Sequence, residues 1–356
     1  MRHAVIMAGG AGQRLWPLSR SVRPKQLLKL VDGKSLLRQA YMRVANLLPA
    51  DSIYVITNRD HLGLIAEDLP ELPPENLFGE PVGRDTANAV GLSAAILKQR
   101  DPEAVIGIFT ADHIITPMDR FVTAVGTAYD MALDRPGALG TLGIRPTRPE
   151  TGYGYVQRGA PIADGVYQVR RFAEKPDADM AKRYLASGDY SWNSGMFTWT
   201  ADAILGQLAQ HLPESHEGVT RIAEVWDTAR RDEVLDSVYP TLPKISIDFA
   251  VMEKAPGVFV VEMDCSWVDV GSWAALEEVT DHDADGNVLG AARTVTLDAG
   301  GNVLVSEDEH LIAAFGVQDL VIVHAADATL VCRKQDAQAL KKLVSRLNDV
   351  HPGKYV

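Results

Sequence analysis

The sequence predicts an α/β fold with a mixed, mostly parallel sheet, followed by a small C-terminal β unit that ends in a helix. Three observations indicate this fold class. Short apolar runs rich in β-branched residues alternate with longer helical patterns over most of the 356 residues. These runs are apolar throughout, which is typical of parallel strands that helices cover on both faces. Near Asp281 the rhythm ends, and short strand-like runs follow at close spacing.

Four runs in the first part of the chain are predicted as strands, and three longer stretches between them as helices. The predicted strands are Ala4–Met7, Ile53–Thr57, Val105–Thr110 and Leu139–Ile144. The predicted helices are Ser35–Leu47, Thr86–Lys98 and Phe121–Leu133. In parallel sheets, ligands bind where the carboxyl ends of strands meet loops and helix N-termini. Residues that directly follow a strand are therefore the first candidates for function.

The acidic, turn-rich segment DHDADGNV predicts a domain boundary, which divides the chain into residues 1–281 and 282–356. Beyond it, five short runs separated by Gly or Asp turns predict a small all-β unit. They are Thr294–Leu297, Val303–Ser306, Leu311–Phe315, Leu320–His324 and Thr329–Cys332. The last predicted helix, Asp336–Leu347, carries leucine and valine along one side. Such a stripe suits packing on the β unit or on a second subunit.

The composition is that of a globular protein and excludes several functional classes. Hydrophobic residues make up 46% and charged residues 23% of the chain, which argues against disorder. A formal net charge of −12 offers no basic field for nucleic acid or an anionic membrane, so any phosphate must meet local cations. Cys265 and Cys332 are too few for a disulfide framework. No apolar run reaches the roughly 18 residues of a membrane helix, and we expect a cytoplasmic protein.

A glycine-rich loop, AGGAGQRLWPL, follows the first predicted strand. Its small residues let backbone N–H groups approach an anion without obstruction. Leu15 stands where the dinucleotide fingerprint needs glycine, and no Gly-Lys-Ser/Thr triplet stands at P-loop spacing after these glycines, so neither fingerprint is present. Instead, Arg14 and Lys25 supply a guanidinium and an ammonium, which suit a triphosphate. The backbone positions of the predicted cradle are Ala8, Gly9, Gly10 and Gly12.

The segment GGAGQRLWPLSRSVRPKQ resembles the signature of the sugar-1-phosphate nucleotidyltransferases, and its LWPLSR and PKQ parts are similar to the mannose-1-phosphate guanylyltransferase branch. The C-terminal segments GNV, GVQDLV and LVC are similar to the family's short β-helix-like domain. The resemblance implies a Rossmann-like nucleotidyltransferase domain. It also implies guanylyl transfer from GTP to α-D-mannose 1-phosphate, which gives GDP-mannose and pyrophosphate. Longer relatives append an isomerase domain, and isomerase activity is not expected here.

Two aspartates are candidates to bind a divalent metal. Asp112 comes just after the strand Val105–Thr110, and Asp269 precedes a glycine turn in WVDVGSW. Mg²⁺ binds through one or two carboxylates together with substrate oxygens. From spacing alone, each aspartate could equally cap a following helix. By resemblance both match the family's metal-binding aspartates, which implies Mg²⁺ as the cofactor, whereas His113 is interpreted as a structural neighbour.

Three further segments, ETGYGY, FAEKP and WNSGMF, offer the acid, cation and amide that a hexose phosphate requires. By resemblance, Lys175 contacts the sugar phosphate, while Glu174 and Asn193 bind sugar hydroxyls. Gly154 lies in the loop whose backbone can approach the ligand. Asp248, in SIDFAVME, orients the sugar or caps the helix that follows.

The segment EPVGRDTA resembles the family's base-side loop, which implies that Gly83, Asp85 and Thr86 contact the base. The sequence departs from the family here, since asparagine is usual at the position of Asp85 and proline at Asn88. A carboxylate only accepts hydrogen bonds, so it changes the contacts that an amide would make with the base.

A phosphate dianion is already a nucleophile, so we expect in-line attack on the α-phosphorus without a general base. Arg14 and Lys25 would cover the triphosphate, and Lys175 the incoming phosphate. The Asp85 departure leaves open the same chemistry with another sugar 1-phosphate or nucleoside triphosphate. A non-catalytic regulator that binds sugar nucleotides is the alternative of a different class. The striped last helix makes a homodimer through the C-terminal domain plausible.

Overall fold

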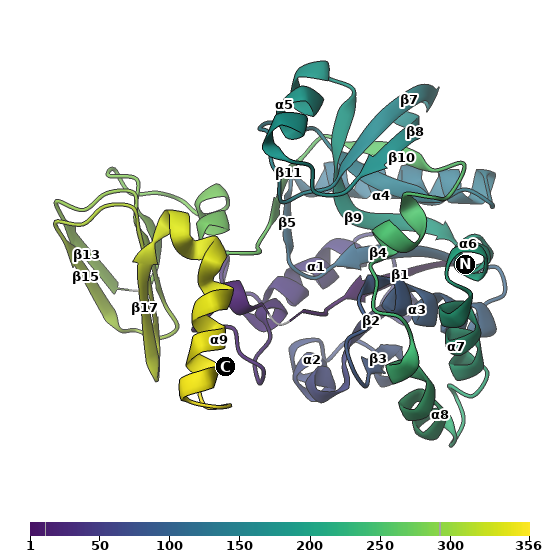
Figure 1. The fold of residues 1–356 in the computed structure, drawn as a ribbon, viewed down its shortest axis with the longest axis horizontal. Coiled ribbons are helices and arrows are strands. Elements are labelled where there is room, and N and C mark those ends of the chain that lie inside the picture. Colours follow the sequence, from purple (N-terminus) through teal and green to yellow (C-terminus); the bar gives the residue numbers. More distant parts are fainter. Residues whose placement is uncertain (11, 292) are drawn as a thin grey trace. The chain divides into compact units, whose positions relative to one another are not determined.

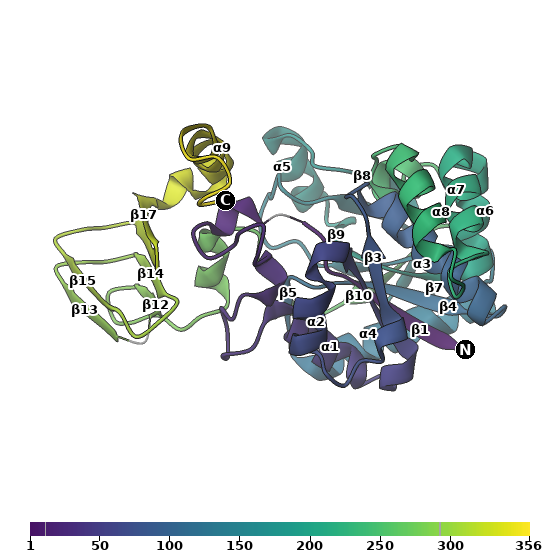
Figure 2. The ribbon, with the colours of Figure 1, turned by 90° about the horizontal axis from the view of Figure 1, so that it is seen from below.

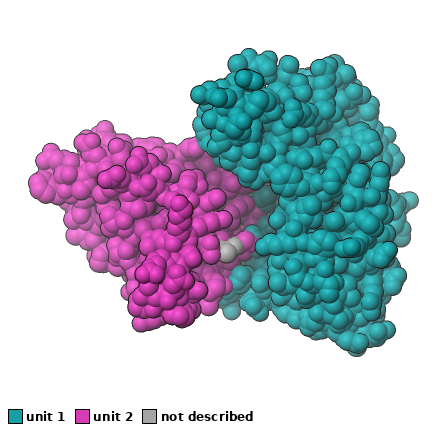
Figure 3. All heavy atoms as spheres, in the orientation of Figure 1, with its two compact units in different colours: residues 1–9, 41–110, 115–266 teal, residues 10–40, 111–114, 267–356 magenta. Residues whose placement is uncertain are grey.

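The computed structural model describes residues 1–10, 12–291 and 293–356, which form two compact units, each assembled from separate stretches of chain (Figure 3). Unit 1 comprises residues 1–9, 41–110 and 115–266, and unit 2 comprises residues 10–40, 111–114 and 267–356. The units are defined by packing and not by chain order. The domain boundary placed after residue 281 remains a prediction.

Unit 1 is built on a nine-stranded mixed sheet with the strand order β3-β2-β1-β4-β9-β6-β10-β8-β7. Its strands are β1 (Arg2–Met7), β2 (Ile53–Asn58), β3 (Leu77–Glu80), β4 (Val105–Thr110), β6 (Gly140–Ile144), β7 (Tyr155–Ala163), β8 (Val166–Ala173), β9 (Tyr190–Thr200) and β10 (Phe259–Met263). The strands β3, β2, β1 and β4 are parallel to one another. Because β7 pairs with both β8 and β9, the last five strands close on themselves. The two short strands β5 (His113–Thr116) and β11 (Ser266–Asp269) form a separate sheet.

Helices cover both faces of the large sheet (Figures 1 and 2). One face carries α3 (Thr86–Arg100), α6 (Ala201–His211), α7 (Pro213–Ala223) and α8 (Arg231–Val238), and the other carries α4 (Met118–Asp134). The remaining helices of the first part are α1 (Leu36–Ala45), α2 (Leu62–Asp68) and α5 (Ala178–Ser187). The helix α3 is buried over most of its length, and its small residues permit this. A Cβ on Gly91 would lie 3.0 Å from a methyl group of Leu208 on α6.

Unit 2 contains the six C-terminal strands. They are β12 (Val288–Gly290), β13 (Arg293–Leu297), β14 (Val303–Ser306), β15 (Leu311–Phe315), β16 (Leu320–Ala325) and β17 (Ala328–Arg333). Two sheets, β12-β14-β16-β17 and β13-β15, stack strands of successive coils in parallel, except that β17 returns antiparallel to β16. This arrangement confirms the predicted small β unit with a β-helix-like course (Figure 2).

Two buried asparagines join successive coils of the β unit. The side-chain oxygen of Asn287 accepts hydrogen bonds from the backbone and side-chain nitrogens of Asn302, at 3.0 and 2.9 Å. The Asn302 oxygen in turn accepts from the backbone of Leu320 at 2.9 Å. Both residues are fully buried, and their hydrogen bonds offset the loss of water around the amides.

The C-terminal helix packs on the β unit. A 3₁₀ segment, Lys334–Ala339, leads into α9, Leu340–Val350, so the predicted helix is present but begins with a tighter turn. Leu340 and Val344 on α9 are buried in the same core as Val321 and Leu330. Leu15, Trp16 and Leu18 of the glycine-rich loop also belong to this core. In the part of the chain that the structure describes, no helix has the length and apolar character needed to cross a bilayer.

Candidate active site

The glycine-rich loop leaves β1 at a fixed point and then turns sharply. In unit 1, the Ala8 amide donates to the Ile56 carbonyl at 2.8 Å, and the Ala8 carbonyl accepts from Thr57 Oγ1 at 2.9 Å. Gly10 and Gly12 have φ values of 116° and 57°, in the left-handed region that favours glycine. Among the described residues, nothing lies within 4 Å of the position a Cβ would take at Gly9 or Gly10, so there is open space beside their backbone. The intervening Ala11 lies outside the described residues.

Gly12 brings the loop against the lysine that the sequence singled out. A Cβ at this position would lie 2.5 Å from Lys25 Cβ and 2.5 Å from Ser19 Oγ, so only glycine fits without a shift. The charged side chains that the sequence predicts for the triphosphate and the metal all lie in unit 2. We call Arg14, Lys25, Asp112 and Asp269 the charged cluster.

Ion pairing holds the charged cluster together. Lys25 Nζ forms an ion pair with Asp112, and both side chains are largely buried. Burial opposes charge on Asp112, but the Lys25 ammonium outweighs it and lowers the pKa of this carboxyl to about 2. Burial likewise disfavours the Lys25 ammonium, yet the charges of Asp112 and Asp269 raise its pKa above the ordinary value. Lys25 and Asp112 therefore remain charged at neutral pH.

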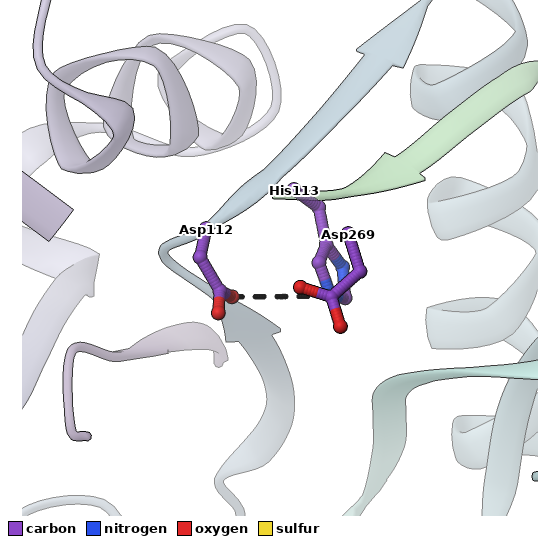
Figure 4. A group of neighbouring side chains, drawn as sticks. All are labelled: Asp112, His113 and Asp269. Carbon is purple, nitrogen blue, oxygen red and sulfur yellow. Dashed lines mark ion pairs between the residues drawn. The ribbon is translucent and has the colours of Figure 1, made fainter. Parts of the chain in front are cut away.

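Asp112, His113 and Asp269 form a group that could hold a metal ion (Figure 4). One ligand atom from each residue lies within 4.8 Å of the others. The Val270 amide donates to the Asp112 carbonyl at 3.0 Å, which links the segments that carry the two aspartates. Burial, then the nearby charge of Asp112, raises the pKa of Asp269. Asp269 Oδ1 is buried and has no hydrogen-bond partner among the described residues, and a cation would satisfy it.

His113 lies in this group and also contacts Trp267. Its Nδ1 accepts a hydrogen bond from Trp267 Nε1 at 3.1 Å, and its Nε2 lies 3.8 Å from Asp112 Oδ1. The imidazole packs edge-on against the Trp267 ring, with 4.9 Å between the centroids. The interpretation of His113 as a structural neighbour remains a prediction, because the same ring is also within reach of a metal.

Arg14 completes the charged cluster. Its charge acts on both Lys25 and Asp269, which places the guanidinium close to them. Within the described chain, its Nε atom is buried and has no hydrogen-bond partner. A buried guanidinium nitrogen without an acceptor can donate a charge-assisted hydrogen bond to a bound anion.

The residues predicted for the sugar come together in unit 1, and we call Gly154, Glu174, Lys175, Asn193 and Asp248 the polar cluster. Asn193 is at its centre. Its Nδ2 donates to Asp248 at 2.9 Å, and its backbone amide donates to the Gly154 carbonyl at 2.8 Å. A Cβ on Gly154 would lie 2.5 Å from a carboxylate oxygen of Glu174, which explains glycine at this position.

Two members of the polar cluster have unusual environments. Lys175, at a φ of 47°, forms an ion pair with the neighbouring Glu174. A left-handed lysine is strained, and such strain is typical of functional sites. Burial, and then the charge of Glu174, raises the pKa of Asp248 to about 6. Asp248 is the first residue of a short π-helix, Asp248–Met252, and its side chain accepts from Asn193 and makes no cap.

The base-side loop is connected to the polar cluster through residue 247. Asp85 precedes α3 with a φ of 66° and a ψ of 179°, and its carboxylate accepts from the Thr86 amide at 2.8 Å. Thr86 Oγ1 accepts from the Ile247 amide at 2.8 Å, directly before Asp248. A Cβ at Gly83 would meet nothing within 4 Å, so packing does not require glycine there.

Two families of known proteins match successive parts of the chain. The profile described as nucleotidyl transferase matches residues 3–286, and that of a MannoseP isomerase/GMP-like beta-helix domain matches residues 292–347. The chain therefore belongs to the nucleotidyl transferase family, whose members are enzymes that transfer nucleotidyl groups.

Individual relatives resemble the chain over nearly its whole length. It is 41% identical to a mannose-1-phosphate guanylyltransferase of Klebsiella pneumoniae, over 99% of this chain and 75% of that protein. It is 42% identical to one of Escherichia coli, over 96% of this chain and 73% of that protein. A crystal structure of a mannose-1-phosphate geranyltransferase from Thermus thermophilus has a TM-score of 0.87 and 38% identity, covering 98% and 99% of the two chains. These matches confirm the resemblance to the guanylyltransferase branch.

One aspect of the site could not be predicted from the sequence. The predicted first domain includes the glycine-rich loop, whereas Leu15, Trp16 and Leu18 are buried with the C-terminal strands. The only signal was the apolar pattern LWPL within an otherwise polar loop. Such a pattern shows that the residues are buried, but it does not identify the surface that covers them.

Proposed function

We propose that this chain transfers a guanylyl group from GTP to α-D-mannose 1-phosphate and releases GDP-mannose and pyrophosphate. The observation that carries the proposal is the charged cluster, in which two cations and two carboxylates from three separate chain segments meet in unit 2. The named relatives support mannose 1-phosphate as the acceptor.

Charge neutralisation and positioning are the main tasks of a nucleotidyltransferase. Arg14 and Lys25 would bind the triphosphate, supported by backbone amides of Gly9, Gly10 and Gly12. Asp112 and Asp269 would hold Mg²⁺, which when bound would neutralise charge on the triphosphate and the leaving pyrophosphate. No general base is required, because the sugar phosphate oxygen is itself the nucleophile that attacks the α-phosphorus in line.

The polar cluster and the base-side loop would bind the rest of the substrates. Glu174, Asn193 and Asp248 present acceptors and a donor suited to sugar hydroxyls, and Lys175 provides a cation for the sugar phosphate. Asp85, Gly83 and Thr86 would face the base. The Asp85 carboxylate suits the donor edge of guanine, since a carboxylate accepts paired N–H groups.

The test is pyrophosphate release with Mg²⁺, crossing GTP, UTP, dTTP and ATP against mannose, glucose and heptose 1-phosphates. We expect activity with GTP and mannose 1-phosphate. Activity confined to another pair would retain the chemistry and replace the substrates. Folded protein that binds GDP-mannose but releases no pyrophosphate with any pair would instead indicate the non-catalytic regulator.

We also propose that two copies associate through the C-terminal domain. Four apolar side chains on β13 and β15 are between 53% and 70% exposed, namely Val295, Leu297, Leu311 and Phe315. Contiguous exposed apolar surface is typical of an interaction site. Light scattering should report a dimer, and Phe315→Glu should shift it to monomer. A wild-type monomer at micromolar concentration would contradict the proposal.

A cytoplasmic location completes the proposal. Its support is that Cys265 and Cys332 are both free thiols in the structure, as expected in a reducing compartment. Cell fractionation with compartment markers tests it, and recovery with a membrane or extracellular fraction would overturn it.

A further inference from the structure

The chemistry proposed above uses Arg14 and Lys25 but leaves the residues between them without a role. Trp16 is 6% exposed, and its Nε1 donates to the Tyr355 carbonyl at 2.7 Å. The Trp16 carbonyl accepts from Trp273 Nε1 at 2.9 Å. All of these residues belong to unit 2. The middle of the loop is therefore tied to the C-terminal part of the same unit.

Each of the three side-chain nitrogens of Arg20 donates a hydrogen bond. Its Nε donates to the Pro17 carbonyl at 2.9 Å, within the loop itself. Its two terminal nitrogens donate to the two oxygens of Asp327 at 3.0 and 2.5 Å. Only 13% of the Arg20 side chain is exposed. A bidentate guanidinium–carboxylate pair is directional as well as strong, so this contact fixes the orientation of the loop and not only its distance.

Asp327 lies in the tight turn between β16 and β17, which is part of a paired hairpin. The hydrogen bond from Arg20 lowers the pKa of Asp327, so the carboxylate stays charged at neutral pH. The loop is therefore attached to a paired hairpin as well as to the Tyr355 carbonyl.

A second tether lies just before the functional lysine. Arg23 forms an ion pair with Glu307, which follows β14. Arg20 and Arg23 exchange backbone hydrogen bonds at 2.9 and 3.0 Å, which closes the turn that leads to Pro24 and Lys25. The two arginines thus hold both sides of one turn, two and five residues ahead of Lys25.

We infer that Arg20 and Asp327 are positioning residues, which hold the glycine-rich loop against the β16–β17 hairpin so that Arg14 and Lys25 are preorganised for a triphosphate. The inference rests on the proposed function for its kinetic consequences. Cations on an untethered loop would lose conformational freedom on binding the triphosphate, and that loss would weaken binding. Neither residue is assigned any contact with substrate.

The test compares Asp327→Asn, which removes the charge, with Asp327→Glu, which restores it, and Arg20→Lys, which keeps the charge but loses the fork. The matched control is Glu309→Gln, which breaks the Arg293–Glu309 ion pair of the same β unit and leaves the Arg20–Asp327 and Arg23–Glu307 pairs in place. We expect Asp327→Asn and Arg20→Lys to raise KM for GTP about 10-fold, on the scale of small misplacements of binding groups. KM for mannose 1-phosphate should stay within about two-fold, because the fold and the polar cluster of unit 1 are untouched.

Hydrogen exchange of residues 9–26 gives a readout that does not depend on activity. In Asp327→Asn, amide exchange in this segment should become about ten-fold faster while the melting temperature stays close to that of Glu309→Gln. Asp327→Glu should restore both KM and exchange. Unchanged exchange and unchanged KM for GTP would overturn the inference, as would equal rises in both KM values. If wild type releases no pyrophosphate with any pair of substrates, the proposed function fails. Hydrogen exchange and the binding of a fluorescent GTP analogue then still test whether Arg20 and Asp327 position the loop.

Discussion

The surroundings of the buried acidic side chains differ between the two units. Unit 2 gathers opposite charges, and pairing with Lys25 lowers the pKa of the buried Asp112 to about 2. In unit 1, burial outweighs the nearby hydrogen bonds and charges at two acids, and it raises the pKa of Glu80 to about 7 and that of Asp248 to about 6. The first environment suits phosphate and metal, whereas the second suits neutral hydroxyls and a base. The comparison predicts that changes in unit 2 affect turnover, and changes in unit 1 affect selectivity or stability.

The largest effect should come from removing Lys25, one of the two cations of the charged cluster. We expect Lys25→Ala to lower kcat/KM by about 10²–10³-fold, the usual effect of deleting one preorganised charge stabiliser. Pyrophosphate release measures this, with Lys34→Ala as the exposed control. Near-normal turnover of a folded Lys25→Ala protein would remove Lys25 from the triphosphate site. Melting temperatures should be compared as well, because Lys25 is largely buried and paired.

The next effect should come from the metal-capable group. We expect Asp269→Asn to lower the Mg²⁺-dependent rate about 100-fold, since one of two carboxylate ligands is lost. Electron paramagnetic resonance with Mn²⁺ should show weaker metal binding at the same time. The control is Asp349→Asn on the exposed side of α9. Full activity with unchanged Mn²⁺ affinity would exclude Asp269 from the metal site.

In unit 1, the buried Glu80 should make stability depend on pH. Tyr239 donates to Glu80 at 2.5 Å, and burial raises the pKa of Glu80 from 4.5 to about 7 in the folded state. Since the folded state holds this proton more tightly than the unfolded state, the contribution of Glu80 to stability is most favourable below about pH 4.5 and falls as the pH rises to about 7. Glu80→Gln cannot ionise, so it should be more stable than wild type by about 3 kcal/mol at pH 8.

Urea denaturation of both proteins from pH 4.5 to pH 8 measures this difference. Glu103→Gln, an exposed acid of the same unit, should run parallel to wild type. If the Glu80→Gln and wild-type curves are parallel too, Glu80 is not a neutral acid in the folded state.

The smallest effect should come from the polar cluster. We expect Asn193→Ala to raise KM for mannose 1-phosphate about ten-fold, the loss expected for one buried hydrogen-bonding group. KM for GTP should change much less, which a matched pair of titrations will show. Asn46→Ala, at an exposed amide, is the control. Equal changes in both KM values would mean that Asn193 does not act on the sugar in particular.

Local patterns predicted most of the fold. The strands Val303–Ser306 and Leu311–Phe315 match β14 and β15, because turns at Gly and Asp bound each run on both sides. The antiparallel pairing of β9 with β4 and β6 could not be predicted from the sequence, since Tyr190–Thr200 is an aromatic run whose partners lie far away in the chain.

The candidate site was predicted residue by residue but not as an arrangement. The resemblance named Lys25, Asp112 and Asp269, and the structure brings all three together. It did not show that Lys25 is buried and paired, because burial depends on long-range packing. The assignment of the loop to one packing unit with the C-terminal strands likewise depends on contacts such as that of Arg20 with Asp327, for which sequence spacing carries no signal.

The hydrogen bond between Trp16 and Tyr355 spans 339 positions of the chain. At about 5–20 residues per second, a ribosome needs roughly 17 to 70 seconds to make the intervening residues. During this time Leu15, Trp16 and Leu18 have no C-terminal core to enter, so they stay exposed to water and to chaperones. The loop that carries Arg14 and Lys25 is therefore synthesised well before its partners, and its final packing must wait until the C-terminal strands and Tyr355 have been made.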